Sequence, residues 1–153
     1  MLVLKRTDNN DKDFHLLVEQ LNQDLLDRYG ELQLRYNRFN QIDNIPNVVV
    51  AYENENRLGC ACFKKFDEQS AEVKRMFVKA EARGKGIGAA ILTELEQWAA
   101  ELGYTAMVLE HGFKQPEASI LYERLGYTII PNYGEYIGLE ETSICRKKMI
   151  SLG

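Results

Sequence analysis

Short hydrophobic runs separated by polar turns occupy the first half of the chain and predict strands. The runs are Leu2–Arg6, Val48–Tyr52, Leu58–Phe66 and Ala71–Val78. The last three follow one another with only a few polar residues between them, which is typical of consecutive antiparallel strands joined by tight turns. The sequence therefore predicts an antiparallel meander that ends at Val78.

Two longer stretches have apolar residues at three- and four-residue steps, the spacing of an amphipathic helix. The first begins after Asp11 or Asp13, either of which could cap it, and Gly30 is expected to end it. Its expected apolar face consists of Phe14, Leu17, Val18, Leu21, Leu25 and Leu26. The second is Ile87–Leu102, followed by Gly103, with a face of Ile87, Ile91, Leu95, Trp98 and Leu102.

The second half of the chain continues with strands and one short helix. Thr105–Glu110 is a buried-type strand, so the preceding strand and helix predict a right-handed crossover between parallel strands. Pro116–Leu125 is a short helix, and Tyr127–Ile130 and Thr142–Met149 are the last two strands. We expect an α/β (α+β) fold in which residues 1–153 form a single domain. Its mixed, mostly antiparallel sheet has about six to seven strands flanked by helices.

Composition adds limits to this picture. The 153 residues are 45% hydrophobic and 27% charged, and the formal net charge is −4, which fits one globular domain that does not attract nucleic acid or anionic membranes non-specifically. No window approaches a membrane span. The three cysteines are too few for a disulfide framework, and Cys60 and Cys62 are interpreted as small core residues rather than metal ligands. We expect a cytoplasmic protein without a metal.

A glycine-rich turn between the third meander strand and the second helix carries the chemical signal. Residues 83–88 read RGKGIG. Glycines let the backbone amides of residues 84–89 approach a diphosphate, and a helix N-terminus adds about half an elementary positive charge. Arg83 and Lys85 could add full charges, although a solvated charged edge remains the alternative for each cation. Neither the P-loop pattern nor the Rossmann fingerprint fits this spacing.

With this turn the chain resembles the GNAT superfamily of acyl-CoA-dependent N-acyltransferases. The family signature Q/R-x-x-G-x-G/A is met by Arg83, Gly86 and Gly88. A second signature, a short helix with a tyrosine before a turn glycine, is met by residues 118–127, ASILYERLGY. The order of the predicted elements agrees with the family over essentially the whole chain.

The resemblance implies a cosubstrate, acetyl-CoA, and a set of residues that bind it. The pyrophosphate is expected against the turn, and the pantetheine arm along the last meander strand, from which the following parallel strand splays away. Gln115 stands where the family often has an asparagine that touches pantetheine. The residues carried over are Met76, Phe77, Val78, Arg83, Gly84, Lys85, Gly86, Ile87, Gly88, Gln115 and Ala118.

The resemblance also implies direct acyl transfer from a thioester to an amine. Tyr122 matches the tyrosine that commonly protonates the departing CoA thiolate. Glu72 is the candidate base, with an exposed position at a strand end as the equally weighted alternative. His111 could be a base, but a polar loop residue is the favoured interpretation. A backbone N–H near Met76 could stabilise the oxyanion.

The acceptor is the open part of this prediction. Aromatic residues expected to line its site are Tyr133, Tyr136, Tyr29, Tyr36 and Phe39. The leading hypothesis is acetylation of a primary amine on a small molecule. Acetylation of a lysine or a protein N-terminus, and a non-catalytic acyl-CoA-binding module, remain alternatives, and a homodimer is an open possibility.

Overall fold

The computed structural model describes residues 1–30 and 44–152. The chain forms two compact units, which are described separately. The first consists of Met1–Lys64 and Lys74–Leu95, and the second of Lys65–Val73 and the chain from Glu96 onward. Strand β4 (Ser70–Val78) and helix α3 (Ile87–Glu101) each continue from one unit into the other.

The first unit contains the antiparallel meander that the sequence predicts. Its strands are β1 (Leu2–Thr7), β2 (Asn47–Glu53), β3 (Asn56–Lys65) and the second half of β4, in that order across the sheet. The pairs β1/β2 and β2/β3 are antiparallel. Asn54 and Glu55, between β2 and β3, both have positive φ angles of 51° and 69°, as a two-residue hairpin turn with a matching twist requires.

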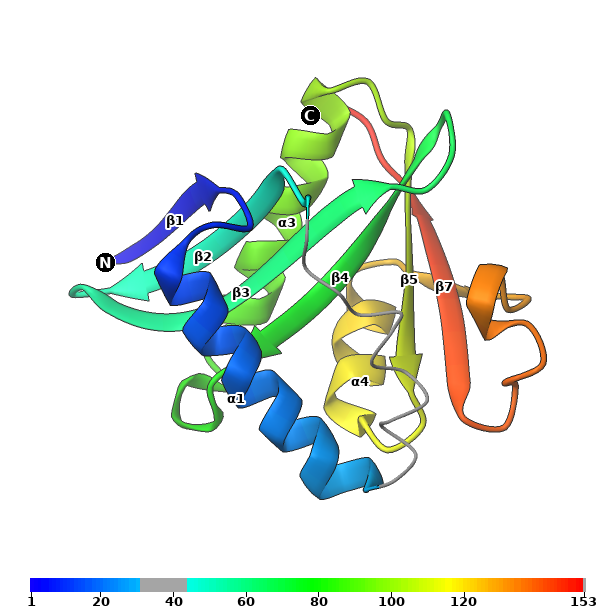
Figure 1. The fold of residues 1–153 in the computed structure, drawn as a ribbon. Helices are drawn as coiled ribbons and strands as arrows, with labels where there is room; N and C mark the ends of the chain where they lie inside the picture. The colour runs from blue at the N-terminus through cyan, green and yellow to red at the C-terminus, as the bar shows by residue number, and fades with distance from the viewer. Residues whose placement is uncertain (31–43, 153) are drawn as a thin grey trace. The chain divides into compact units, whose positions relative to one another are not determined.

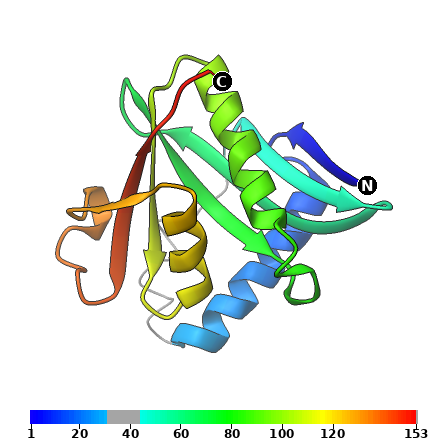
Figure 2. The ribbon, with the colours of Figure 1, turned by 180° about the vertical axis from the view of Figure 1, so that it is seen from behind.

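Helix α1 (Lys12–Tyr29) covers one face of this meander, and the first half of α3 covers the opposite face (Figures 1 and 2). Side chains alternate across a strand, so Val48, Val50, Cys60 and Cys62 join the core under α1, together with Phe14 and Leu17. Both cysteines are buried, which confirms their prediction as core residues. Leu26 and Leu102 were predicted wrongly, because their side chains are 42% and 56% exposed at the helix ends.

Gly59 in β3 is where the first unit packs most closely. A Cβ atom at this position would lie 2.6 Å from the Phe77 carbonyl oxygen and 3.1 Å from the Ile91 side chain. No other residue fits without shifting β4 or α3. Gly59 therefore lets α3 pack directly on the meander.

The second unit continues the sheet in the order β4, β5, β7, β6. Ser70–Glu72 of β4 pairs in parallel with Ala106–Val108 of β5 (Ala106–Gly112), which confirms the predicted crossover. Strand β7 (Ser143–Met149) pairs antiparallel with both β5 and β6 (Thr128–Ile130). Helix α4 (Pro116–Arg124) lies against β5 (Figures 1 and 2).

Within residues 1–30 and 44–152, two short 3₁₀ helices and one irregular strand residue were not predicted. The 3₁₀ turns are η2 (Ala80–Ala82), in the connection after β4, and η3 (Gly134–Tyr136), in the loop before β7. Arg75, inside β4, has a φ of 58°, a left-handed conformation that costs a non-glycine residue roughly 1–2 kcal/mol. No helix within residues 1–30 and 44–152 combines the length and the apolar character needed to cross a membrane.

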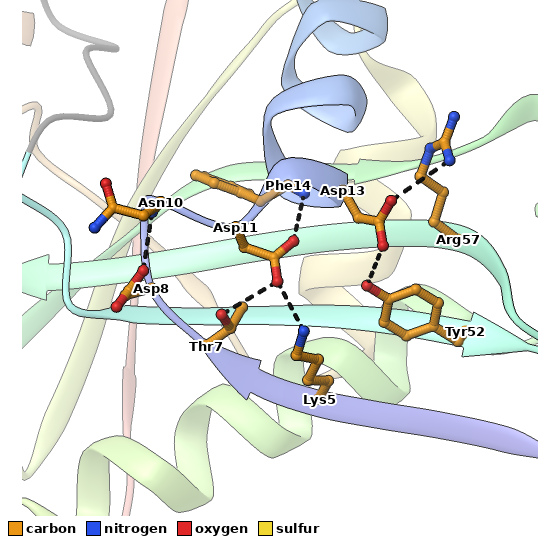
Figure 3. A network of polar contacts seen from close by, with 9 residues as sticks. All are labelled: Lys5, Thr7, Asp8, Asn10, Asp11, Asp13, Phe14, Tyr52 and Arg57. Atoms are coloured by element: carbon orange, nitrogen blue, oxygen red, sulfur yellow. Dashed lines mark hydrogen bonds and ion pairs between the residues drawn. The ribbon is translucent and has the colours of Figure 1, made fainter.

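A polar network surrounds the N-terminus of α1 (Figure 3). Asp11 is the N-cap, and its carboxylate accepts hydrogen bonds from the Phe14 amide at 3.0 Å, from Lys5 Nζ at 3.0 Å and from Thr7 Oγ1 at 3.2 Å. Asp13, the other predicted cap, instead accepts a hydrogen bond of 2.6 Å from the Tyr52 hydroxyl. Partial burial raises the pKa of Asp11, but these hydrogen bonds outweigh it and hold the pKa below its usual value.

We predict that Asp11→Ala lowers the free energy of unfolding by about 1 kcal/mol at pH 7, because the N-cap acceptor is lost. The native pKa of Asp11 is depressed, so its contribution is present above the unfolded-state value of about 4 and disappears as pH falls through the native value. Urea denaturation at several pH values measures this difference. Glu19→Ala, an exposed change on the same helix, is the control and should stay within about 0.5 kcal/mol of wild type.

Candidate functional site

The glycine turn in the first unit has the geometry of an anion cradle. Gly84 and Gly86 have φ angles of 80° and 78°, which favour glycine, and a Cβ at either position would meet nothing within 4 Å. These glycines are therefore required by backbone conformation, and they leave open space above the turn. Arg83 reaches back, and its Nε donates to the Val78 carbonyl at 3.0 Å.

The backbone amides of residues 84–89 are available to a ligand. Within the described part of the chain they donate no hydrogen bond to another backbone group, whereas the first helical bond after the turn runs from the Ala90 amide to the Gly86 carbonyl at 3.0 Å. The first amides of a helix have no partner inside it and together form a site for negative charge. Lys85 is exposed beside them. A diphosphate fits this donor set.

Strand β4 makes an irregular step just before the predicted pantetheine-binding residues. The left-handed Arg75 breaks the regular alternation of the strand. Thiol groups on β3 face the carbonyls at this step, with Cys62 Sγ 3.3 Å from the Lys74 oxygen and Cys60 Sγ 3.5 Å from the Arg75 oxygen. The step changes the direction in which the following backbone groups point.

The predicted pantetheine strand offers mainly its backbone. Phe77 is 8% exposed and belongs to the core under α1, so its side chain is committed to packing. Met76 and Val78 are half-buried. One predicted contact, the Val78 carbonyl, already accepts a hydrogen bond from Arg83; a carbonyl oxygen has two lone pairs and can accept a second one.

Tyr122 lies in the second unit, on α4. Its side chain is 4% exposed, and its ring contacts those of His111 and Tyr127, with centroid distances of 5.5 Å and 5.9 Å. Its hydroxyl makes no hydrogen bond in the described part of the chain. Burial, and then the negative charge of Glu110, raise the pKa of Tyr122, so it carries its proton at neutral pH.

His111 is not the polar loop residue that we favoured from the sequence. It lies in β5, is 3% exposed, and its Nε2 accepts a hydrogen bond of 3.0 Å from Arg146 Nε. Its proton is therefore on Nδ1, 3.3 Å from the Gly112 carbonyl. Burial is the main cause that lowers the pKa of His111, and the charge of Arg146 adds to it. With its lone pair engaged by a guanidinium, His111 is a poor candidate for a base.

Glu72 is not at an exposed strand end, which removes the alternative that we weighed against a base. Its side chain is 4% exposed, and its Oε2 accepts a hydrogen bond of 2.9 Å from the Tyr133 hydroxyl. Tyr133 packs edge-on against Phe66 and Tyr136, with centroid distances of 4.6 Å and 5.7 Å. Glu72 thus binds one of the aromatic residues predicted to line the acceptor site, Tyr133, which packs against another, Tyr136.

The remaining residues predicted to bind the cosubstrate or the acceptor have positions that neither support nor oppose those roles. Gln115 precedes α4, and its Oε1 accepts a hydrogen bond of 3.0 Å from the Gly112 amide, while Ala118 is half-buried on α4. Tyr29 packs against the core of the first unit. Tyr36 and Phe39 lie outside the described residues.

The structure gives no support for Cys145 as a nucleophile that carries the acyl group, and none for a metal site among the described residues. Burial is the main cause that raises the pKa of Cys145 to about 11, so it is a thiol at neutral pH. Among the described residues, no three His, Cys, Asp or Glu side chains are grouped so that they could hold a metal ion.

The chain belongs to the GNAT acetyltransferase family. The family described as "Acetyltransferase (GNAT) domain" matches residues 44–129, more than half of the chain. This range contains both the glycine turn and Tyr122.

Two curated relatives share part of this sequence. An IAA acetyltransferase of Azospirillum brasilense is 35% identical over 89 residues, which are 58% of this chain and 58% of the relative. An uncharacterized N-acetyltransferase of Schizosaccharomyces pombe is 31% identical over 87 residues, 56% of this chain and 53% of the relative. The chain thus matches little more than half the length of these relatives.

Solved structures share the fold over nearly the whole chain. A Klebsiella pneumoniae protein whose name proposes an acyl-CoA N-acyltransferase has a TM-score of 0.81 at 22% identity, and 98% of each chain is covered. An acetyltransferase of Streptococcus agalactiae has a TM-score of 0.76 at 22% identity, with 97% of this chain and 98% of the other covered. yncA of Salmonella typhimurium, solved with its cofactor acetyl-CoA, has a TM-score of 0.68 at 20% identity, covering 100% and 95%.

We predict that the Glu72–Tyr133 hydrogen bond contributes measurably to stability, because its acceptor is a buried carboxylate. A double-mutant cycle with Glu72→Ala and Tyr133→Phe should give a coupling energy of about 1–2 kcal/mol in urea denaturation. The cycle is its own control, since effects of each single change on packing cancel. A coupling close to zero would show that this hydrogen bond does not form in solution.

Proposed function

We propose that the chain is an N-acetyltransferase that moves an acetyl group from acetyl-CoA to a primary amine of a small molecule. Residues 1–153 act as a single acetyltransferase domain in this proposal. The observation that carries it is the family match over residues 44–129, which includes an open glycine turn and a buried tyrosine with an unengaged hydroxyl.

The glycine turn binds the diphosphate of the cosubstrate. Its amides at residues 84–89 donate to phosphate oxygens, and the N-terminus of α3 and the side chain of Lys85 add positive charge. Arg83 contributes by fixing the turn to the end of β4 through Val78. The acetyl-CoA bound to yncA supports this ligand for the shared fold.

Strand β4 receives the pantetheine arm along its backbone. Met76, Phe77 and Val78 supply amide and carbonyl groups, with Gln115 and Ala118 as further contacts. The left-handed Arg75 supports a role for the next amide, at Met76, because a bulge re-aims the backbone groups that follow it. This amide is the proposed donor to the oxyanion that forms on the acyl carbonyl.

Tyr122 is the proposed general acid. A buried phenol with a raised pKa keeps its proton at neutral pH, and an unengaged hydroxyl can donate that proton to a departing thiolate. Bound acyl-CoA supplies the activated thioester. Tyr122 supplies the proton that the sulfur gains, and solvent returns it after turnover.

Glu72 is the proposed base, acting directly or through water. The acceptor nitrogen must lose a proton to attack the thioester carbonyl carbon. The C–N bond forms first and places the negative charge on the acyl oxygen, and the C–S bond breaks when this oxyanion collapses; one proton passes from nitrogen to Glu72, and one passes from Tyr122 to sulfur. Tyr133 and Tyr136, which adjoin Glu72, are the proposed acceptor-lining residues.

The decisive experiment is an acetyl-transfer assay with a broad panel of amines, in which the release of free CoA thiol measures the reaction. Small polyamines and simple primary amines should be acetylated faster than lysine-containing or N-terminal peptides. Faster reaction with peptides would replace the small-molecule acceptor with a protein one. Acetyl-CoA binding without thiol release for any amine would indicate a non-catalytic module.

Tyr122→Phe tests the acid. The change keeps the buried ring and removes the proton, so we expect kcat to fall by about tenfold or more while KM for acetyl-CoA stays within about twofold. Tyr104→Phe, in the turn before β5, is the matched control and should keep wild-type kcat. An unchanged kcat in Tyr122→Phe would remove Tyr122 from the chemistry.

Gly86→Ala tests the cradle. A Cβ at this position projects into the open space of the turn and strains a φ of 78°. We expect the Kd for CoA, measured by calorimetry, to rise by about tenfold or more. Gly103→Ala is matched in strain, with a φ of 96° and open space, but lies at the end of α3. It should lose similar stability and bind CoA normally; equal losses of affinity would argue against the cradle.

A further inference from the structure

Arg146 is a buried cation that the sequence analysis did not single out. It lies in β7, is 2% exposed, and all three of its hydrogen bonds are 3.0 Å long. The acceptors are His111 Nε2, the Tyr127 carbonyl and Ser119 Oγ. All three acceptors are neutral, and Arg146 forms no ion pair in the described part of the chain. Burial of a guanidinium without a carboxylate is costly and is weak evidence for a role in stability alone.

Each of the three acceptors belongs to a residue that either packs against Tyr122 or lies on the same helix. His111 and Tyr127 are the residues whose rings pack against the Tyr122 ring. Ser119 precedes Tyr122 by three positions on α4 and so lies on the same side of that helix. Arg146 therefore binds both flanking residues of the tyrosine and the helix that carries it.

We propose that Arg146 is a positioning residue that fixes Tyr122 for proton donation through its contacts with His111, Tyr127 and Ser119. The inference rests on the role of Tyr122 in the proposed function. The planar guanidinium suits this task because it can hold three acceptors in one fixed arrangement. Its charge also opposes the effect of burial and of Glu110 on Tyr122, which makes the phenol a better acid.

An outer set of contacts holds Tyr127 in the same arrangement. Its hydroxyl donates to Glu96 at 2.8 Å, and Lys148 Nζ is 2.8 Å from the other oxygen of that carboxylate. Lys148 also lies over the Tyr127 ring, 5.7 Å from its centroid. Tyr127, which packs against Tyr122, is thus held by contacts from both β7 and α3. Arg146 adds the contacts that link Tyr127 to β5 and α4.

The test compares Arg146→Met and Arg146→Lys in wild-type and Tyr122→Phe backgrounds. Arg146→Met keeps the length of the side chain and removes its charge and donors. We expect kcat to fall by about tenfold, with KM for acetyl-CoA within about twofold. Arg146→Lys restores the charge and one donor and should recover a substantial part of the loss. In the Tyr122→Phe background, Arg146→Met should change kcat by less than about twofold, because both act on one step.

The results distinguish the role of Tyr122 as the acid from the role of Arg146 as its positioning residue. If Tyr122→Phe alone keeps wild-type kcat, the proposed acid is wrong. If Tyr122→Phe lowers kcat but Arg146→Met does not, or if the two losses multiply, the positioning role of Arg146 is wrong while the acid stands. Should Arg146→Met fail to fold, Ser119→Ala replaces it. This change removes one acceptor from Arg146 and should lower kcat by about two- to fivefold at unchanged KM, and an unaltered kcat would overturn the inference.

Discussion

The hydrogen bond from Arg146 to His111 is the contact around which the groups next to Tyr122 are arranged in the second unit. It joins β7 to β5 across a register in which His111 faces Ile144 and Cys145 faces Glu110. It also fixes the histidine tautomer, since a guanidinium can only donate. The other two nitrogens of Arg146 then tie this strand pair to α4 and to the turn that follows it. The Tyr122 ring lies among the groups that this one side chain holds.

The first unit depends on a different constraint, the absence of side chains at particular glycines. Gly59 lets α3 pack against β4, and Gly84 and Gly86 give the turn between them its left-handed conformation. Close packing of α3 fixes the direction of its N-terminus. The turn determines which amides stand free at that end. A cation side chain is therefore not required to create the anion cradle; Arg83 instead contacts the backbone of β4.

Much of the fold and part of the site could be predicted from sequence, because they follow from local patterns. Alternating runs, helical spacing and helix-ending glycines predicted the strands and the three α-helices of the described residues, and the glycine turn is visible as a motif. Arg75 could not be predicted, since its left-handed φ results from tertiary context. Arg146 resembles any exposed cation in the stretch ICRKK. Its burial depends on His111 and Ser119, which are distant in sequence, and Glu72 is buried by Tyr133 in the same non-local way.

The groups around the proposed base and those around the proposed acid lie on opposite faces of β5. Glu72 pairs in register with Val108, and His111, whose ring contacts that of Tyr122, lies three residues further along β5. Because side chains alternate across a strand, Val108 and His111 point to opposite faces of the sheet. The two groups also have different neighbours: Tyr133 binds Glu72, whereas His111 and Tyr127 pack against Tyr122. The nearby Cys145, a thiol with a raised pKa, is poorly suited to carry the acyl group as an intermediate. Since Glu72 and Tyr122 are held by different neighbours, substitutions at one can be interpreted separately from substitutions at the other.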